Sequence, residues 1–280
     1  MLQNKTVAFL GAGSMAEAMI SGIVHDGKIP AKQVIATNKS SHDRLQELSA
    51  TYGITAVKRD ALDYGNIDIF ILAMKPKHAE DALSEIKDRL RPDQLILSVL
   101  AGISTSFIEE RLNAGQQVIR VMPNTSSMIG ESATAITPGK HAAMDKVQDA
   151  KMLLQGIGGV SIIDEDKMDV FTGIAGSGPA YIYYLVEHIE KTGMAAGLDK
   201  ALAREIAVQT IFGASKMLME TDTSPTDLRE NVTSPNGTTA AGLEALEKNG
   251  GGVAIAEAIK GAAERSKEIS AELQKTPIPN

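Results

Sequence analysis

The first 164 residues alternate short apolar runs with segments of helical periodicity, and this alternation limits the fold more than any other feature. The runs are apolar throughout rather than at every second position, which is typical of parallel strands covered on both faces. Strands joined by helices in this order predict an α/β, doubly wound parallel sheet. The expected strands cover residues 6–11, 33–38, 54–57, 67–74, 94–100, 117–123, 133–137 and 159–163.

Beyond residue 164 the pattern changes to helices alone. We therefore expect two domains, residues 1–164 with the sheet and residues 165–280 all helical, since 280 residues are long for one core. The expected helices cover residues 179–196, 199–220, 225–232, 238–248 and 252–273.

The helix expected at 199–220 is apolar over much more than one face, with Ile206, Ile211 and Phe212 among its side chains. A helix of this kind is normally buried. A small helical domain cannot cover it alone, so a second copy of the chain is favoured, and packing against the first domain is the alternative. We therefore expect a homodimer.

Composition excludes several classes of function. A net charge of −7 argues against nucleic acid and against anionic membrane surfaces as partners. The chain has no cysteine, and its five histidines lack the spacing of metal ligands, so no metal is expected. The longest apolar run, residues 67–74, is too short to span a bilayer, and the N-terminus does not resemble a signal peptide. We expect a soluble, cytoplasmic protein.

A glycine-rich turn follows the first expected strand. Gly11, Gly13 and Ala16 form the pattern G-x-G-x-x-A at the start of a helix. The first glycine permits a tight turn, the second lets backbone approach a pyrophosphate, and the helix start attracts phosphate through its free N–H groups. At the first βα turn of such a sheet, the pattern predicts a Rossmann-type dinucleotide site, with Ser14 and Met15 as further contacts.

The second expected strand ends in Asn38, Lys39 and Ser40, where NAD enzymes usually carry an acid. These side chains could bind a 2′-phosphate, so we expect NADP as cofactor, with NADPH preferred and NADH as the alternative. Capping of the next helix is the other interpretation. Loops at later strand ends are further candidate cofactor contacts, because open parallel sheets bind ligands there; these are Ala73, Lys75, Pro76, Ala101 and Gly102.

Two turns in the helical half are candidate ligand sites. Residues 234–237, Ser-Pro-Asn-Gly, predict a β-turn, after which Thr238 and Thr239 begin a helix. Amide groups and hydroxyls there could hold a small carboxylate, or could simply cap the helix, and the residues leave both interpretations open. In the second turn, Ser177 or Gly178 is expected to cap a helix that has Pro179 at its first position.

Five motifs occur in a characteristic order: GAGSMA, AMKP, VMPNTSSMIGE, AGSGPAYIYYLVE and LRENVTSPNGTTAAGLEALE. With them the whole chain resembles the pyrroline-5-carboxylate reductases. The resemblance implies an oxidoreductase that reduces 1-pyrroline-5-carboxylate to L-proline with NAD(P)H, the last step of proline biosynthesis. It also implies a Rossmann domain followed by a dimerisation domain, with five dimers forming a decamer in some members.

The resemblance also assigns roles to residues. Ser234, Gly237, Thr238 and Ser177 would bind the substrate, and Thr239 would hydrogen-bond its ring nitrogen. Glu165 would meet that nitrogen as it becomes an ammonium, and Thr172 would line the same region. The nicotinamide would lie near Ala101, Gly102 and Asn124.

Two positions depart from the family pattern. Asn236 stands where relatives usually carry glycine, and asparagine tolerates left-handed backbone better than most residues. Asp60 stands where relatives often carry Asn near the ribose phosphate, and an acid there would weaken NADPH relative to NADH.

Two other functions are weighed against this one. A 3-hydroxyacid dehydrogenase would need a Lys-x-x-x-Asn pair, but Lys191 is followed four residues later by Ala195. A non-catalytic nucleotide sensor would not need the hydroxyl-rich turn at residues 234–239.

Overall fold

The computed structural model describes residues 2–39 and 41–274. The chain forms two compact units: Met1–Ser177 together with Gly261–Asn280, and Gly178–Lys260.

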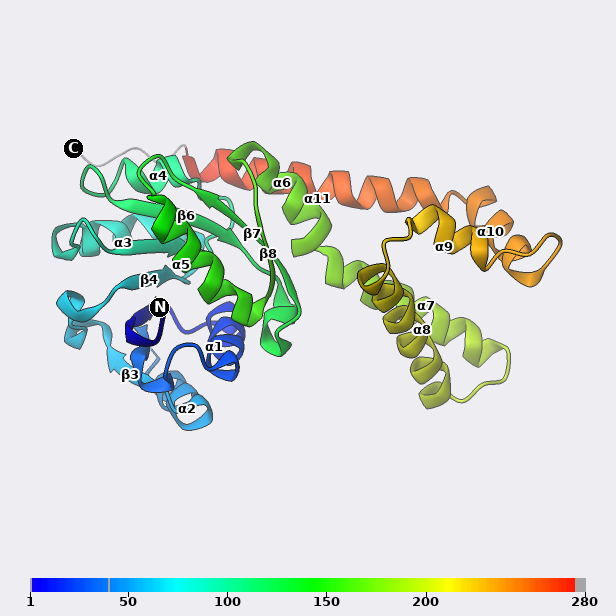
Figure 1. Ribbon diagram of the computed structural model, residues 1–280, viewed down its shortest axis with the longest axis horizontal. Coiled ribbons are helices and arrows are strands. Elements are labelled where there is room, and N and C mark those ends of the chain that lie inside the picture. The colour runs from blue at the N-terminus through cyan, green and yellow to red at the C-terminus, as the bar shows by residue number, and fades with distance from the viewer. Residues whose placement is uncertain (1, 40, 275–280) are drawn as a thin grey trace. The chain divides into compact units, whose positions relative to one another are not determined.

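The first unit is built on an eight-stranded sheet (Figure 1). Its order is β3-β2-β1-β4-β5-β6-β7-β8, and every neighbouring pair is parallel except β6 and β7. The strands are β1 Val7–Leu10, β2 Val34–Asn38, β3 Thr55–Lys58, β4 Ile69–Leu72, β5 Leu95–Ser98, β6 Gln117–Met122, β7 Ser132–Pro138 and β8 Gly158–Ile162. Each lies where the apolar runs predicted it, so the predicted fold class is confirmed.

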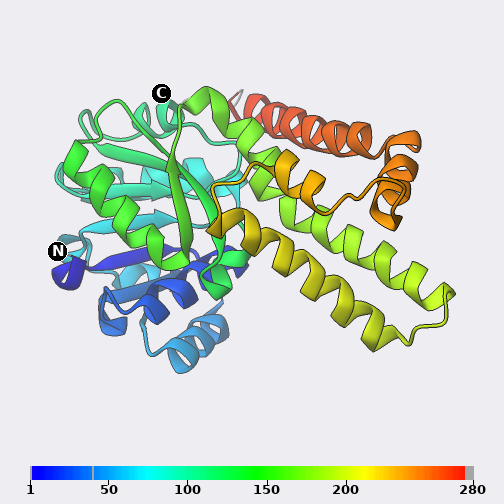
Figure 2. The same cartoon turned by 45° about the vertical axis from the view of Figure 1, so that its right-hand side comes forward.

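Helices cover both faces of this sheet (Figure 2). One apolar cluster joins it to α1 (Ser14–Asp26), α2 (His42–Tyr52) and α5 (Met144–Leu154). A second joins the opposite face to α3 (Ala79–Ile86) and α4 (Thr105–Glu109). Strands β1, β4 and β5 are wholly buried between these layers, which is why β1 and β4 are apolar at every position and β5 is apolar except at Ser98.

The strand register determines where a ligand can bind. Leu10 at the end of β1 lies opposite Thr37 of β2 and Leu72 of β4. The carboxyl ends of these three parallel strands therefore meet at one edge of the sheet. The order β2-β1-β4 is also the switch point at which such folds bind nucleotides.

The segment after β8 corrects one prediction. Helix α6 (Met168–Phe171) continues into a π-helical turn, Thr172–Gly176, and α7 (Gly178–Ala195) follows. Ser177 has helical dihedrals, φ −87° and ψ −18°, and its N–H donates to the carbonyl of Thr172 at 2.9 Å. The prediction that Ser177 or Gly178 caps a new helix is wrong, because Ser177 has helical dihedrals and Gly178 is already the first residue of α7. Because Pro179 has no N–H, the hydrogen-bond ladder rearranges just before it, and a π turn accommodates this change.

The final helix, α11 (Gly251–Gln274), returns the chain to the first unit from Gly261 onward. Ser266 Oγ donates to Asp169 of α6 at 2.7 Å. A Cβ at Gly102 would lie 2.9 Å from Ile269 Cγ2 of this helix. These contacts make the observed division differ from the expected boundary at residue 164, since residues 165–177 and the last part of α11 belong with the sheet.

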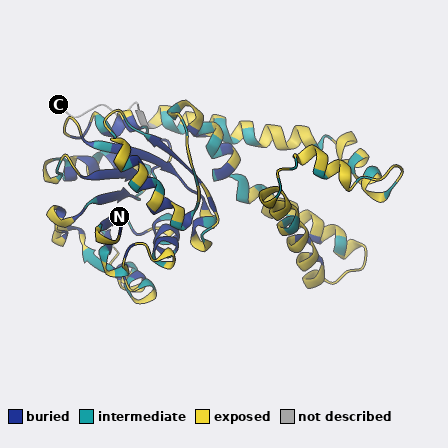
Figure 3. Ribbon diagram, in the orientation of Figure 1, coloured by how far each residue is buried: buried dark blue, intermediate teal, exposed yellow. Residues whose placement is uncertain are grey.

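The second unit contains α7, α8 (Lys200–Glu220), α9 (Pro225–Asn231), α10 (Thr238–Lys248) and the start of α11. Helices α7 and α8 approach closely, since a Cβ at Gly193 would lie 3.1 Å from the Cβ of Ala203. Most side chains of this unit are exposed in the single chain, as Figure 3 shows in yellow. On α8 only Ala203 and Ala207 are buried, while Phe212 is 59% exposed.

Among the described residues, no helix has the combination of length and apolar character that crossing a membrane requires.

Candidate functional site

The glycine turn after β1 has the geometry of a phosphate cradle. Gly11 has φ +130°, and a Cβ there would lie 2.3 Å from the carbonyl oxygen of Ala73. A Cβ at Gly13, by contrast, would meet nothing within 4 Å, so this backbone faces open space. Gly13 is also the N-cap of α1 and provides no side-chain acceptor. The first amides of α1 therefore have no capping side chain, which fits a pyrophosphate at this helix start.

Arg44 of α2 supports this turn, and sequence reasoning missed it. Its Nε donates to the carbonyl of Ala12 at 3.1 Å, and its Nη2 pairs with Glu17 of α1. Hydrogen bonds to Glu47 and Glu17 raise the pKa of the Arg44 guanidinium above its ordinary value. No local motif marks Arg44, because its partner Ala12 lies 32 positions earlier in the sequence.

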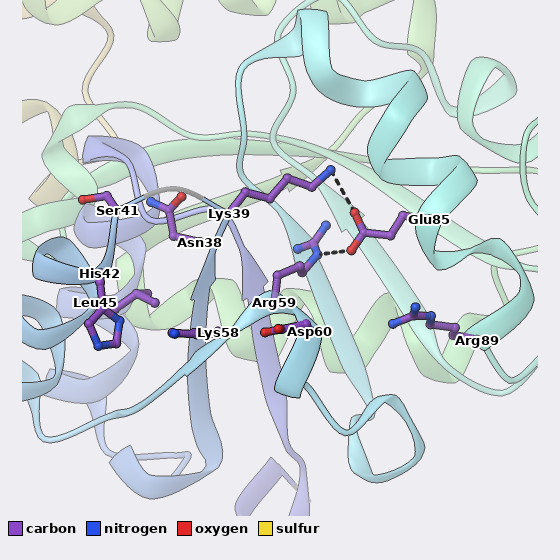
Figure 4. A pocket seen from close by; sticks show the side chains of 10 residues that line it. All are labelled: Asn38, Lys39, Ser41, His42, Leu45, Lys58, Arg59, Asp60, Glu85 and Arg89. Carbon is purple, nitrogen blue, oxygen red and sulfur yellow. Dashed lines mark hydrogen bonds and ion pairs between the residues drawn. The ribbon is translucent and has the colours of Figure 1, made fainter.

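Two cavities open at the carboxyl ends of β1, β2, β3 and β4. The larger, about 550 Å³, is shown in Figure 4. The smaller, about 280 Å³, shares three lining residues with it: Asn38, Lys39 and Arg59. Gly11 and Met74 line the smaller one, so the cavities extend from the glycine turn to the end of β3. Asn38 and Lys39 therefore line both cavities at the end of β2, while their contact with a cofactor stays a prediction, and predicted Ser40 falls outside the described residues.

The carboxylate of Glu85 lies beside these cavities and forms ion pairs with two cationic side chains. Glu85 of α3 pairs with Lys39 Nζ at 2.9 Å and with Arg59 Nε at 3.0 Å (Figure 4). Burial opposes ionisation of Glu85, but the hydrogen bonds and charges of Lys39 and Arg59 together outweigh it and lower the pKa of this carboxyl. Arg59 is buried and also donates from Nη1 to Thr37 Oγ1 at 3.2 Å. Sequence reasoning identified neither Arg59 nor Glu85.

The predicted cofactor contacts after β1 and β4 lie at helix starts or in loops. Pro76 is the first residue of a short 3₁₀ helix with Lys75 as its N-cap. Ala73, Lys75 and Pro76 line neither of the two cavities. Ser14 and Met15 form the first turn of α1.

The predicted nicotinamide contacts lie at the ends of β5 and β6. Gly102, with φ +74°, lies against α11, and Ala101 beside it is exposed. Asn124 is buried and donates from Nδ2 to the carbonyl of Ala175 at 3.0 Å. Their contact with a cofactor stays a prediction.

Glu165 and Thr172 both have partners within the first unit. Glu165 Oε1 accepts from Arg120 Nη1 at 2.5 Å, and its Oε2 accepts from Thr105 Oγ1 at 2.8 Å. Thr172 Oγ1 donates to the carbonyl of Met168 at 2.8 Å. A role for Glu165 at the substrate nitrogen would require it to share an oxygen with these donors, and that role stays a prediction.

In the second unit, the hydroxyl-rich turn has the predicted form. Gly237 N donates to the carbonyl of Ser234 at 3.0 Å, which closes a β-turn, and Asn236 has φ +58°. Gly237 is the N-cap of α10, again without a side-chain acceptor, and a Cβ there would lie 2.3 Å from Ser234 Oγ. Thr238 and Thr239 form the first turn of α10 and are exposed in the single chain.

A neighbouring helix shows what an ordinary cap looks like. Ser224 Oγ accepts from the N–H of Asp227 at 3.1 Å at the start of α9. No hydroxyl does this for α10, where the N-cap is a glycine. The simple-cap interpretation therefore has no capping hydroxyl to support it, and an anion cradle at this turn stays a prediction. Within residues 2–39 and 41–274, no cluster of acidic, histidine or cysteine side chains could hold a metal ion.

Comparison with known proteins covers the whole chain. A family model described as pyrroline-5-carboxylate reductase dimerisation matches residues 165–269, and one described as NADP oxidoreductase coenzyme F420-dependent matches residues 6–102. Pyrroline-5-carboxylate reductase 1 of Bacillus subtilis is 61% identical over 276 residues, covering 99% of this chain and 93% of that protein. Pyrroline-5-carboxylate reductase 2 of the same organism is 42% identical over 265 residues, with 95% of each covered.

Among solved structures, pyrroline carboxylate reductase of Plasmodium falciparum with NADP bound is 28% identical with a TM-score of 0.86. The match covers 96% of this chain and 99% of that one. 1-Pyrroline-5-carboxylate reductase of Streptococcus pyogenes is 31% identical with a TM-score of 0.82, covering 94% and 98% of the two chains.

Proposed function

The chain belongs to the pyrroline-5-carboxylate reductase family, and on that premise we propose that it reduces 1-pyrroline-5-carboxylate to L-proline with NADPH. This is the last step of proline biosynthesis. The observation that carries the proposal is the presence, in one chain, of two helix starts that have a glycine as N-cap and no capping side chain. One follows the glycine turn of a dinucleotide-binding sheet, and the other follows the hydroxyl-rich turn of the helical unit.

NADP(H) fits the residues at the sheet edge. The amides at the start of α1 and the backbone at Gly13 would hold the pyrophosphate, and the cavity beside Asn38 and Lys39 would take the adenosine end. The nicotinamide end would lie near Ala101, Gly102 and Asn124. When bound, the dinucleotide supplies the hydride, and the protein supplies position and electrostatics.

The substrate carboxylate would be held by Ser234 and by the N–H groups of Gly237 and Thr238. Thr239, from this chain or from a second copy, would hydrogen-bond the ring nitrogen. Glu165, Thr172 and Ser177 of the first unit are proposed as further contacts of the substrate. Most of the rate gain then comes from fixing the imine carbon in one orientation. A substrate held in this way has already lost its translational and rotational freedom on binding, so the chemical step does not have to remove it. No histidine is needed as a proton donor if the imine is already protonated when it binds.

For the assembly, we propose a homodimer formed through the helical unit, with a decamer of five dimers as the larger form. The exposed apolar side chains of α8 and the match to a dimerisation family model support this. A cytoplasmic location is proposed with it.

The activity is tested by following NADPH absorbance after adding pyrroline-5-carboxylate to the purified protein, with proline measured as product. NADPH oxidation that depends on the imine is expected. NADP binding with no turnover of pyrroline-5-carboxylate would instead favour a nucleotide sensor.

Thr239→Ala tests the assignment of the ring-nitrogen contact. We expect kcat to fall roughly ten- to a hundredfold, as when one positioned hydrogen-bond donor is removed, with the Kd for NADPH unchanged. Thr233→Ala is the matched control, because the Thr233 hydroxyl already donates to the carbonyl of Arg229 at 2.6 Å. Thr233→Ala should keep wild-type kinetics. Loss of NADPH binding in Thr239→Ala would contradict the assignment of Thr239 to the ring nitrogen.

A further inference from the structure

The larger cavity at the sheet edge is positively charged although the chain as a whole carries −7. Four cationic side chains and two carboxylates line it: Lys39, Lys58, Arg59 and Arg89, with Asp60 and Glu85. The residues come from the ends of β2 and β3 and from the region of α3. This balance of charge suits an anionic ligand.

Two of these cationic side chains form ion pairs with Glu85. Glu85 reaches Lys39 Nζ with one oxygen and Arg59 Nε with the other, as Figure 4 shows. Lys39 and Arg59 are also the charged residues that line both cavities. Glu85 is 24% exposed, so solvent only partly screens its charge.

We propose that Glu85 is a specificity-determining residue that limits the preference for NADPH over NADH by competing with the 2′-phosphate for Lys39 and Arg59. The inference rests on the proposed use of NADP(H). A 2′-phosphate in this cavity must share both cations with Glu85, whose charge also repels it. A cofactor without that phosphate leaves the three-residue cluster of Glu85, Lys39 and Arg59 undisturbed.

Arg59 has two anchors, so it does not depend on Glu85 alone for its place. Its Nη1 donates to Thr37 Oγ1 when Nε faces Glu85. Glutamine at position 85 keeps the shape and a hydrogen-bond acceptor for Arg59 but removes the charge. The variant Glu85→Gln therefore separates charge competition from positioning.

The test compares two ligands that differ only in the 2′-phosphate, adenosine 2′,5′-bisphosphate and AMP, by calorimetric titration of the full chain. In Glu85→Gln, we expect the affinity for the bisphosphate to rise about fivefold, the range of a partly exposed ion pair, with the AMP affinity unchanged. Asp88→Asn is the control, because it removes the same charge from an exposed position three residues later that lines neither cavity. It should alter neither affinity.

An unchanged or lower ratio of the two affinities in Glu85→Gln would overturn the inference. Lys39→Met provides an independent measurement at an exposed position, where the bisphosphate affinity should fall about fivefold and the AMP affinity should stay. An unchanged ratio in Lys39→Met would also overturn it. If neither ligand binds the wild-type chain, the proposed cofactor site itself fails, which is a different result.

Discussion

Gly11 shows how a single residue determines the cofactor site. Its φ of +130° is a region that side chains rarely adopt, and a Cβ would lie 2.3 Å from Ala73 O. We expect Gly11→Ala to lower the free energy of unfolding by about 2–3 kcal/mol and to abolish NADP binding, because strain and steric overlap act at the same position. Urea unfolding and ligand titration measure the two effects. Gly27→Ala is the control, since Gly27 has φ +71° with nothing within 4 Å, and it should cost stability alone.

At the scale of an element, the turn of residues 234–237 determines how helix α10 begins, because Gly237 of this turn is the N-cap of the helix. Asn236 has left-handed backbone, φ +58°, where most residues other than glycine and asparagine are strained. We expect Asn236→Ala to destabilise the chain by about 1 kcal/mol, while Asn236→Gly keeps the stability and stays within about twofold of the wild-type kcat/KM. Thermal unfolding and steady-state kinetics check the pair. Equal stability of the two variants would mean that the backbone at this position relaxes.

For the whole molecule, the exposed apolar side chains of α8 are the surface that the proposed dimer would cover. Phe212 is 59% and Met219 80% exposed in the single chain, which is costly for side chains of this size. We expect light scattering to find a dimer for the wild-type chain and a monomer with unchanged helical circular dichroism for Phe212→Asp. Gln148→Asp adds the same charge at an exposed position of α5 and should leave the dimer intact. A dimeric Phe212→Asp would remove α8 from the interface.

Local features were predictable from the sequence alone, because neighbours in the chain determine them. The buried strands follow from continuous apolar runs, and the turn at Asn236 follows from dihedral preferences. The tight turn at Gly11 was predictable for the same reason. Each of these predictions used only the preferences of neighbouring residues, whereas the close approach of Gly11 to Ala73 is a tertiary contact.

Only the tertiary structure decided the contacts between distant segments. Arg59 and Glu85 are 26 positions apart, and Asp169 and Ser266 are 97 apart, so no spacing rule indicates either pair. The second pair is one of the contacts that join α11 to the first unit, and the first pair contributes to the charge of the larger cavity. Such pairs form because separate strands and helices pack together, and packing is a property of the folded chain rather than of any short stretch of it.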